Sequence, residues 1–307
     1  MTTTPSGAEA PLEADATGSP QETQDRPAVA ANTADFERAP LLSPKAYTAS
    51  SAFTAANLLR EARRQKELSA GSVPAVCVLD PDGDLVDFLQ ASGRATLHPT
   101  WACYHTTLLT FVDGGQTYGL IGRVVGAPFA VLVAEELFAS GCALLISVTS
   151  AGQIVATAAP PYIVLIDRAL RDEGTSYHYL PPAPYSHLQP SLRQALHTGW
   201  NATQVPLQIG ASWTTDAPFR ETADMITACR TNGILAVEME AAALYAFATV
   251  AGHAIVCFAL VTNHMAQMEG DFEKGEQAGS ATMLQVLGQT VRCWQQQRHT
   301  DTRKAMR

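Results

Sequence analysis

The sequence lacks the signatures of several large protein classes. No apolar run reaches the roughly 18 residues of a membrane-spanning helix, so we expect no membrane segment. The 6 cysteines form no CxxC pair and lie mostly in apolar runs, as reduced core residues do. His178 has no second ligand at metal spacing and no HExxH motif occurs, so we expect no metal and no cofactor. Positive charge is scarce, and a net charge of −9 disfavours nucleic acid as a partner.

The domain organisation follows from length and composition. With 307 residues, of which 47% are hydrophobic, the chain can bury a full core, and one large domain with tails is the simplest division. Residues 1–45 are rich in Ala, Thr, Pro, Ser and acids, and they cannot bury enough surface to offset their ordering entropy. We therefore expect a disordered tail there, without a targeting signal. We predict the domain over residues 46–298, a second tail over residues 299–307, and a cytoplasmic protein.

The most informative stretch is residues 233–264, GILAVEMEAAALYAFATVAGHAIVCFALVTNH. Residues 234–237 form a short apolar run, and residues 241–250 are Ala-rich and strongly helical. Gly252 stands where a helix C′ residue belongs. Residues 254–261 are unbroken apolar, as in a strand that is buried on both faces. This order predicts a strand–helix–strand unit with two neighbouring strands.

Polar residues in this stretch follow the two predicted strands. Glu238 and Glu240 come after the first strand, and Thr262, Asn263 and His264 come after the second. Open α/β sheets bind ligands at the carboxyl ends of their strands. Two carboxylates enclosed by apolar residues need donors, and a sugar diol would supply them. The plainer alternatives are a favourable charge at a helix start and ordinary turn chemistry after a strand.

The motif VEMEAAALYAFA resembles the signature of the nucleoside phosphorylase/nucleosidase superfamily, which includes purine nucleoside phosphorylases, uridine phosphorylases and nucleosidases. The resemblance extends over about residues 73–294. It implies a three-layer α/β/α domain with a central twisted mixed sheet, and a homo-oligomer that is a dimer, trimer or hexamer. It also implies that Glu240 accepts hydrogen bonds from the sugar 2′- and 3′-hydroxyls. Met239 would pack against the ribose, and Glu238 belongs to the same binding motif.

Two further blocks are similar to family motifs that surround the sugar. Residues 122–128, GRVVGAP, resemble the turn G-x-G-[MI]-G-x-P, in which Val125 matches a ribose-contacting position. The strand over residues 143–148 continues into TSAG, which resembles I-[IV]-R-x-G-[ST]-x-G. Ser150 and Gly152 are retained there. Small residues and exposed backbone N–H groups suit an anion or a sugar hydroxyl.

The base end of the substrate is matched by two features. Residues 211–221, ASWTTDAPFRE, resemble the family's base-pocket loop, and Phe219, with Trp213 as the second candidate, would stack on the base. Asn263 stands where many purine-cleaving relatives carry an aspartate that protonates the base. An amide instead pairs a donor and an acceptor with a base edge, which leaves a 6-oxopurine, a pyrimidine or an unusual base open. His264, beside it, is a further substrate-binding candidate.

The sequence departs from the family at the phosphate site. Gly83 and Ser147 stand where phosphorylases carry arginine, and Leu79 replaces a glycine. Asp82 and Asp84 add negative charge to the same turn. A carboxylate about 5 Å from a phosphate charge costs on the order of 3 kcal/mol at an effective dielectric constant near 20. Nucleosidase relatives carry a carboxylate just after the first strand, where it takes a proton from water.

We therefore predict an enzyme that cleaves the N-glycosidic bond of a nucleoside, more readily by hydrolysis than by phosphorolysis, with Glu240 and Asn263 and either Asp84 or Asp82 as its catalytic residues. Two alternatives stay open. One is a purine or uridine phosphorylase whose phosphate site has moved, with Arg123 as the leading ligand and Arg94 or Arg168 as others. The other is a repurposed or non-catalytic nucleoside-binding member of the superfamily.

Overall fold

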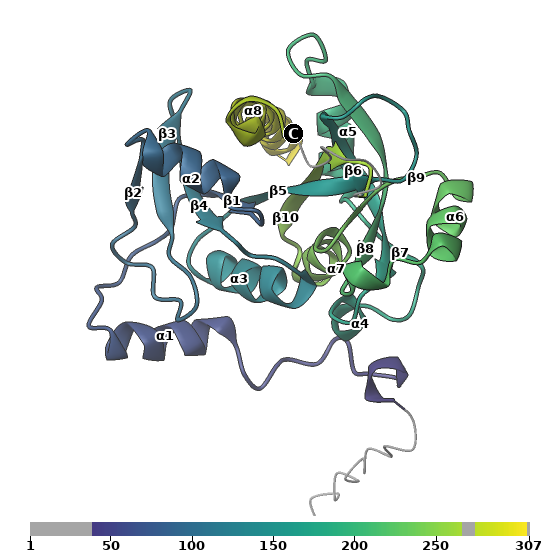
Figure 1. Ribbon diagram of the computed structural model, residues 1–307. Coiled ribbons are helices and arrows are strands. Elements are labelled where there is room, and N and C mark those ends of the chain that lie inside the picture. The colour runs from purple at the N-terminus through teal and green to yellow at the C-terminus, as the bar shows by residue number, and fades with distance from the viewer. Residues whose placement is uncertain (1–38, 266–273, 306–307) are drawn as a thin grey trace, which may run out of the picture. The chain divides into compact units, whose positions relative to one another are not determined.

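A ten-stranded mixed sheet runs through the computed structural model, which describes residues 39–265 and 274–305 of the chain (Figure 1). Its strands are β1 (Val76–Asp80), β2 (Ala95–Leu97), β3 (Leu109–Asp113), β4 (Gln116–Gly122), β5 (Leu144–Gln153), β6 (Tyr162–Asp172), β7 (Tyr185–His187), β8 (Leu207–Thr215), β9 (Ile234–Glu238) and β10 (Ala254–Asn263). Parallel pairs join β4, β1, β5 and β10, and antiparallel pairs join β2 to β3 and β3 to β4. The fully buried pattern of β1 agrees with a parallel strand covered on both faces.

Helices cover both faces of this sheet (Figure 1). They are α1 (Ala55–Gln65), α2 (Asp84–Ala91), α3 (Ala127–Ala139), α4 (Ser176–Tyr179), α5 (Pro190–Gly199), α6 (Ala223–Thr231), α7 (Ala241–Ala251) and α8 (Ser280–Ala305), with short 3-10 turns η1 (Pro40–Leu42), η2 (Pro218–Arg220) and η3 (Glu276–Gly279). Helices α1, α3, α4 and α7 pack together on one face, and α2, α5 and α8 pack on the other. The predicted three-layer α/β/α class with a mixed sheet is confirmed.

Helix α7 shows why these residues form a layer against the sheet. It begins after Glu240 and ends at Gly252, whose φ of 69° is the left-handed conformation that glycine adopts readily. Its residues from Ala241 to Ala248 are all buried, so small side chains let the helix lie close to the strands. Tyr245 donates its hydroxyl proton to the carbonyl of Ile166 at 2.6 Å and so satisfies the one polar group that the helix buries there.

The strands on either side of α7 are not neighbours, which corrects the expected strand–helix–strand pairing. Strand β5 lies between them: it runs parallel to β10 and antiparallel to β9. The reason is that β9 overlaps β5 at its last residues only, where Val237 pairs with Gly152. Gly152 also pairs with Asn263 of β10. The carboxyl ends of β5, β9 and β10 therefore meet around Gly152, although β9 approaches from the opposite direction.

Five of the strands close on themselves. Strand β10 pairs with β5 and β6, β6 with β8, β8 with β9, and β9 with β5. Every strand in this ring pairs with two of the others, although β9 meets β5 through two residue pairs only. The other part of the sheet stays open, and it runs from β5 through β1, β4 and β3 to the short edge strand β2.

The predicted domain limits can be compared with the elements at the two ends. Of the expected tail over residues 1–45, residues 1–38 lie outside the described part, and η1 follows directly after them. Helix α8 continues to Ala305, past the limit expected at residue 298. The apolar face of this helix is buried through Met283, Leu287, Val291 and Trp294. No helix among the described residues is long and apolar enough to cross a lipid bilayer.

We predict that Gly152→Ala lowers the free energy of unfolding. A Cβ there would lie 2.9 Å from Met265 Cγ and 3.1 Å from Val237 Cγ1, so both side chains must shift. Overpacking of this kind costs about 1–3 kcal/mol, measurable by urea denaturation. The control is Gly288→Ala on α8, whose Cβ would meet only Arg292 Nη1, at 3.6 Å, and which is expected to gain about 0.5–1 kcal/mol. Equal urea midpoints for wild type and Gly152→Ala would contradict this account.

Candidate active site

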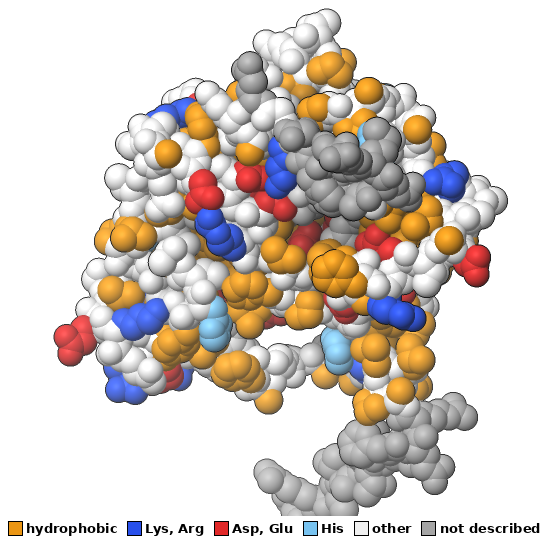
Figure 2. Space-filling model, in the orientation of Figure 1, with side chains coloured by type: hydrophobic (Ala, Val, Ile, Leu, Met, Phe, Trp, Pro, Cys, Tyr) orange, Lys and Arg blue, Asp and Glu red, His pale blue; other side chains and the backbone are white. Residues whose placement is uncertain are grey.

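A cavity of about 620 Å³ opens where the carboxyl ends of β5, β9 and β10 meet. Figure 2 shows acidic and hydrophobic side chains together around a hollow in this face of the molecule. Nine residues that the sequence singled out line it: Asp82, Val125, Ser150, Gly152, Phe219, Glu238, Met239, Glu240 and Asn263. The described lining contains four carboxylates and no arginine or lysine. The described lining therefore offers several carboxylate acceptors to hydrogen-bond donors.

The carboxylate of Glu238 is fully occupied by the protein. One oxygen accepts the hydroxyls of Ser212, at 2.9 Å, and Thr214. The other oxygen accepts the backbone N–H groups of Glu240 and Ala241, each at 2.7 Å. These N–H groups stand at the start of α7, where the helix leaves them without partners of its own. Glu238 therefore fixes the start of α7 and the backbone of Glu240. Each of its carboxylate oxygens already accepts two hydrogen bonds from the protein, so neither has a free lone pair for a ligand.

Glu240 is the carboxylate with an unused acceptor. Its Oε1 accepts the backbone N–H of Gly126, at 2.8 Å, which ties the turn before α3 to the start of α7. Its Oε2 is buried and has no hydrogen-bond partner among the described residues. A buried polar atom without a partner is costly, so this oxygen marks the place where a ligand hydroxyl fits.

The two glutamates differ in how well the protein supports their charge. Burial raises the pKa of Glu238, while its four donors favour the charged form. Burial and the adjacent charge of Glu238 raise the pKa of Glu240 to about 8, and the Gly126 N–H and the Thr149 hydroxyl offset only part of this. Because Glu238 has the larger set of donors, we assign the negative charge to Glu238 and the proton to Glu240 in the free protein.

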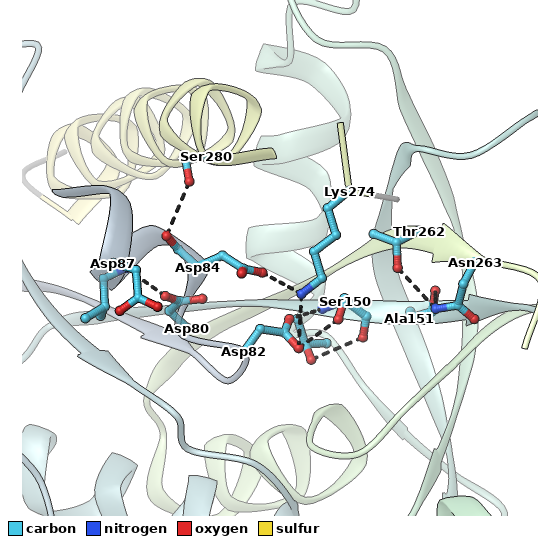
Figure 3. Close-up of polar contacts among 12 residues, drawn as sticks. Asp80, Asp82, Asp84, Asp87, Ser150, Ala151, Thr262, Asn263, Lys274 and Ser280 are labelled. Carbon is cyan, nitrogen blue, oxygen red and sulfur yellow. Dashed lines mark hydrogen bonds and ion pairs between the residues drawn. The ribbon is translucent and has the colours of Figure 1, made fainter. Parts of the chain in front are cut away.

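Asp82 accepts hydrogen bonds from Ser150, in the segment where the sequence suggested donors for an anion. Its Oδ2 accepts the backbone N–H of Ser150 at 2.7 Å, and its Oδ1 accepts the Ser150 hydroxyl at 2.8 Å (Figure 3). Lys274 Nζ lies 3.6 Å from Asp82 Oδ1 and 2.5 Å from an oxygen of Asp84. The turn after β1 is thus held against β5 by its own acidic side chains.

The opposite end of the cavity is less polar, with Phe219, Ile226 and Met265 in its lining. Phe219 of η2 is 99% exposed, so one face of its ring is available to a ligand. Asn263 donates to Thr262 Oγ1 at 3.1 Å and accepts the backbone N–H of Met265 at 2.8 Å, so its amide is held in one orientation (Figure 3). Glu221 completes this end, and burial raises the pKa of its carboxyl group.

Comparison with known proteins identifies the family. The family model described as the phosphorylase superfamily matches residues 75–292. The chain belongs to the phosphorylase superfamily. Among solved structures, the uridine phosphorylase of Vibrio fischeri ES114 complexed with 6-hydroxy-1-naphthoic acid is similar, with 19% identity and a TM-score of 0.55 over 75% of this chain and 90% of that one. A second crystal structure of the same uridine phosphorylase gives 19% identity and a TM-score of 0.53 over the same shares.

Four predicted site residues of this superfamily member lie outside the cavity lining: Trp213, Asp84, His264 and Arg123. Trp213 is 1% exposed and donates its indole N–H to Asp172 Oδ2 at 2.9 Å, so it is a core residue and cannot stack on a base. Asp84 starts α2 and pairs with Lys274. His264 is half-buried, directly after β10.

Arg123 is directed to a different partner from the one expected. Its Nη2 lies 2.7 Å from both carboxylate oxygens of Asp87 on α2, and both side chains are more than half exposed. The guanidinium covers Gly83: a Cβ at that position would lie 2.9 Å from Arg123 Cζ. Gly83 itself has a φ of 89°, which suits glycine. The Arg123 side chain thus covers the turn at Gly83.

The other arginines considered as phosphate ligands are also engaged elsewhere. Arg94 pairs with Asp113 at 2.8 Å, and Arg168 lies over the ring of Tyr185 at 5.0 Å. Neither lines the cavity. Within the described residues, no group of three or more His, Cys, Asp and Glu side chains is arranged to hold a metal ion.

Sequence reasoning missed several members of the site. Lys274 meets Asp84 across 190 positions of sequence, so no local pattern indicates that contact. Thr149 lies beside the retained Ser150 and could have been included with it. Met265 also lines the cavity, and it follows Asn263 and His264 at the end of β10.

We predict that Glu240→Gln removes a pH dependence of stability. A carboxyl group whose pKa is raised by folding keeps its proton in the native state while the unfolded chain loses it. Stability is therefore lost as pH rises from the ordinary value of 4.5 toward about 8. Relative to wild type, the Gln variant should become steadily more stable over this range, as measured by urea denaturation in a pH series. The exposed Glu67→Gln is the matched control, and a parallel trend for both variants would refute the assignment of the proton.

Proposed function

We propose that this member of the phosphorylase superfamily cleaves the N-glycosidic bond of a nucleoside or nucleoside-like substrate, with water as the nucleophile. The observation that supports water is the position of Asp82. Its carboxylate holds the Ser150 N–H and hydroxyl groups, which are the donors in the cavity that an anion would need. A phosphate there would meet a negative charge instead of an arginine.

The sugar is assigned to the Glu240 end of the cavity. The 2′- and 3′-hydroxyls would donate to Glu240 Oε2, the buried acceptor that has no partner among the described residues. Hydrogen bonds to the charged form lower a carboxyl pKa, so substrate binding would release the proton of Glu240. The resulting carboxylate favours the positive charge that develops on the sugar as the bond breaks, which is stabilisation of the transition state. Met239, also in the lining, packs against the ribose.

The nucleophile is assigned to the Asp82 side. A water beside its carboxylate loses a proton to Asp82 while its oxygen forms a bond to C1′. The C1′–N bond breaks, the base leaves with the electron pair and takes up a proton from solvent, and Asp82 returns the proton of the water to solvent. Ser150 holds both oxygens of Asp82 in place, so the general base is positioned before the substrate arrives.

The base is assigned to the less polar end, between Phe219 and Asn263. An exposed phenylalanine ring stacks on any base, so it sets position rather than identity. Asn263 and Glu221 offer acceptors to base N–H groups. A 6-oxopurine, a pyrimidine and an unusual base all fit these groups, and the similarity to a uridine phosphorylase supports a pyrimidine.

Phosphorolysis is the second candidate, because the similar solved structures are named uridine phosphorylases. Phosphate would then be the second substrate, and Lys274 would be the nearest cation to the Asp82 end among the described residues. We further propose a cytoplasmic homo-oligomer, a dimer, trimer or hexamer, in which Phe219 is covered by ligand or by a second subunit.

Product analysis distinguishes the two reactions. We predict free base and free sugar at a rate nearly independent of phosphate concentration, because the Asp82 carboxylate opposes phosphate entry. Asp82→Asn should slow this release by roughly 10²-fold or more, the scale of losing a general base. A panel of nucleosides is incubated with and without phosphate and analysed by chromatography. A sugar 1-phosphate as the main product would show that hydrolysis is the wrong reaction.

We also predict that Glu240→Gln lowers kcat by roughly 10²–10³-fold, the size of one lost electrostatic contact in the transition state. The side chain keeps its shape, so circular dichroism should be unchanged. Steady-state kinetics on the best nucleoside of the panel supply the measurement. Wild-type turnover by this variant would remove Glu240 from the mechanism.

A further inference from the structure

Three donors converge on the carboxylate of Asp82 from two distant parts of the chain. The backbone N–H and the hydroxyl of Ser150 come from β5, at 2.7 and 2.8 Å. The ammonium group of Lys274 comes from the segment before α8, at 3.6 Å (Figure 3). A backbone N–H, a hydroxyl and a cation are the groups with which proteins bind carboxylates, phosphates and sulfates.

We propose that Ser150 and Lys274 form an oxyanion subsite that Asp82 occupies as a built-in ligand, so that Asp82 excludes inorganic phosphate and similar dianions from the cavity. Asp82 is then the residue that selects against an anionic nucleophile. The consequence for the choice of nucleophile rests on the proposed function. The binding statement does not, because it concerns phosphate and the free protein alone.

The built-in ligand has two advantages over a free anion. The turn that carries it is fixed, since the N–H of Gly83 and that of Arg123 both donate to the carbonyl of Asp80, at 3.0 and 2.9 Å. Asp82 is therefore held at its donors without the translational entropy that a free phosphate loses on binding. Its charge also opposes any anion that approaches the same donors.

Other carboxylates face the subsite and limit its affinity. Asp84 shares Lys274, at 2.5 Å, and Asp80 lies close enough to interact electrostatically with Asp82. These groups stay in place when Asp82 is replaced. We therefore expect an opened subsite to bind phosphate in the millimolar range rather than tightly.

Two substitutions separate occupancy from charge. Asp82→Ala removes both the side chain and its charge, so the three donors become accessible. Asp82→Asn removes the charge but keeps a side chain of the same size, whose amide oxygen can still accept from Ser150. If Asp82 is a built-in ligand, only the smaller side chain opens the subsite.

The experiment measures binding of inorganic phosphate by isothermal titration calorimetry, with chloride at matched ionic strength and no nucleoside present. We expect Asp82→Ala to bind phosphate roughly tenfold more tightly than wild type or Asp82→Asn. Adding Lys274→Met to Asp82→Ala should return the affinity to the wild-type level. Asp82→Ser, which also vacates the donors, is measured in the same way in case the Ala variant does not fold.

Two results would overturn the proposal. Equal gains for Asp82→Asn and Asp82→Ala would mean that only general repulsion was relieved, and no gain in a folded Ala or Ser variant would mean that the donors form no subsite. These results are independent of the reaction. Tighter phosphate binding by Asp82→Ala, together with sugar 1-phosphate from the wild type, would keep the donor subsite but refute both hydrolysis and the exclusion of phosphate by Asp82.

Discussion

The hydrogen-bonded carboxylate of Glu238 is the contact on which the arrangement of the cavity depends. It joins Ser212 and Thr214 of β8 to the first N–H groups of α7, so one side chain connects a strand, a turn and a helix. Removing one partner of such a buried set leaves the others unsatisfied, which costs more than the bond itself contributes. Glu240 is directed into the cavity because its own backbone N–H belongs to this set.

The same contact explains why two adjacent acidic residues play different parts. Glu238 receives the donors of a helix start and carries the charge, and Glu240 has only the Gly126 N–H and a weaker contribution from Thr149 beside a strong neighbouring charge. Pairs of carboxyl groups in unequal surroundings separate into one charged and one protonated member. In this cavity the protonated member is the one that has a free position for a ligand.

The sequence allowed local motifs to be predicted, but it did not allow contacts between distant parts of the chain to be predicted. Glu240 and Asn263 could be placed in one cavity because each directly follows a strand whose pattern is plain. The neighbours of those strands could not be predicted, because no local sequence pattern indicates that β5 lies between β9 and β10. Lys274 was missed because its partners lie far along the chain, and the direction of Arg123 was missed because Asp87, on another element, competes for it. Charge competition of this kind becomes visible only when all elements are in place.

Closure of the strands β5, β10, β6, β8 and β9 into a ring has a consequence for selectivity. Main-chain pairing on both sides makes the floor of the cavity stiff, and Glu240 is tied to that floor through Glu238. Phe219, by contrast, stands on a short exposed turn that has few such ties. The cavity can therefore change shape around a ligand only at the end that carries Phe219. We expect a protein of this build to be strict about the sugar it accepts and permissive about the base attached to it.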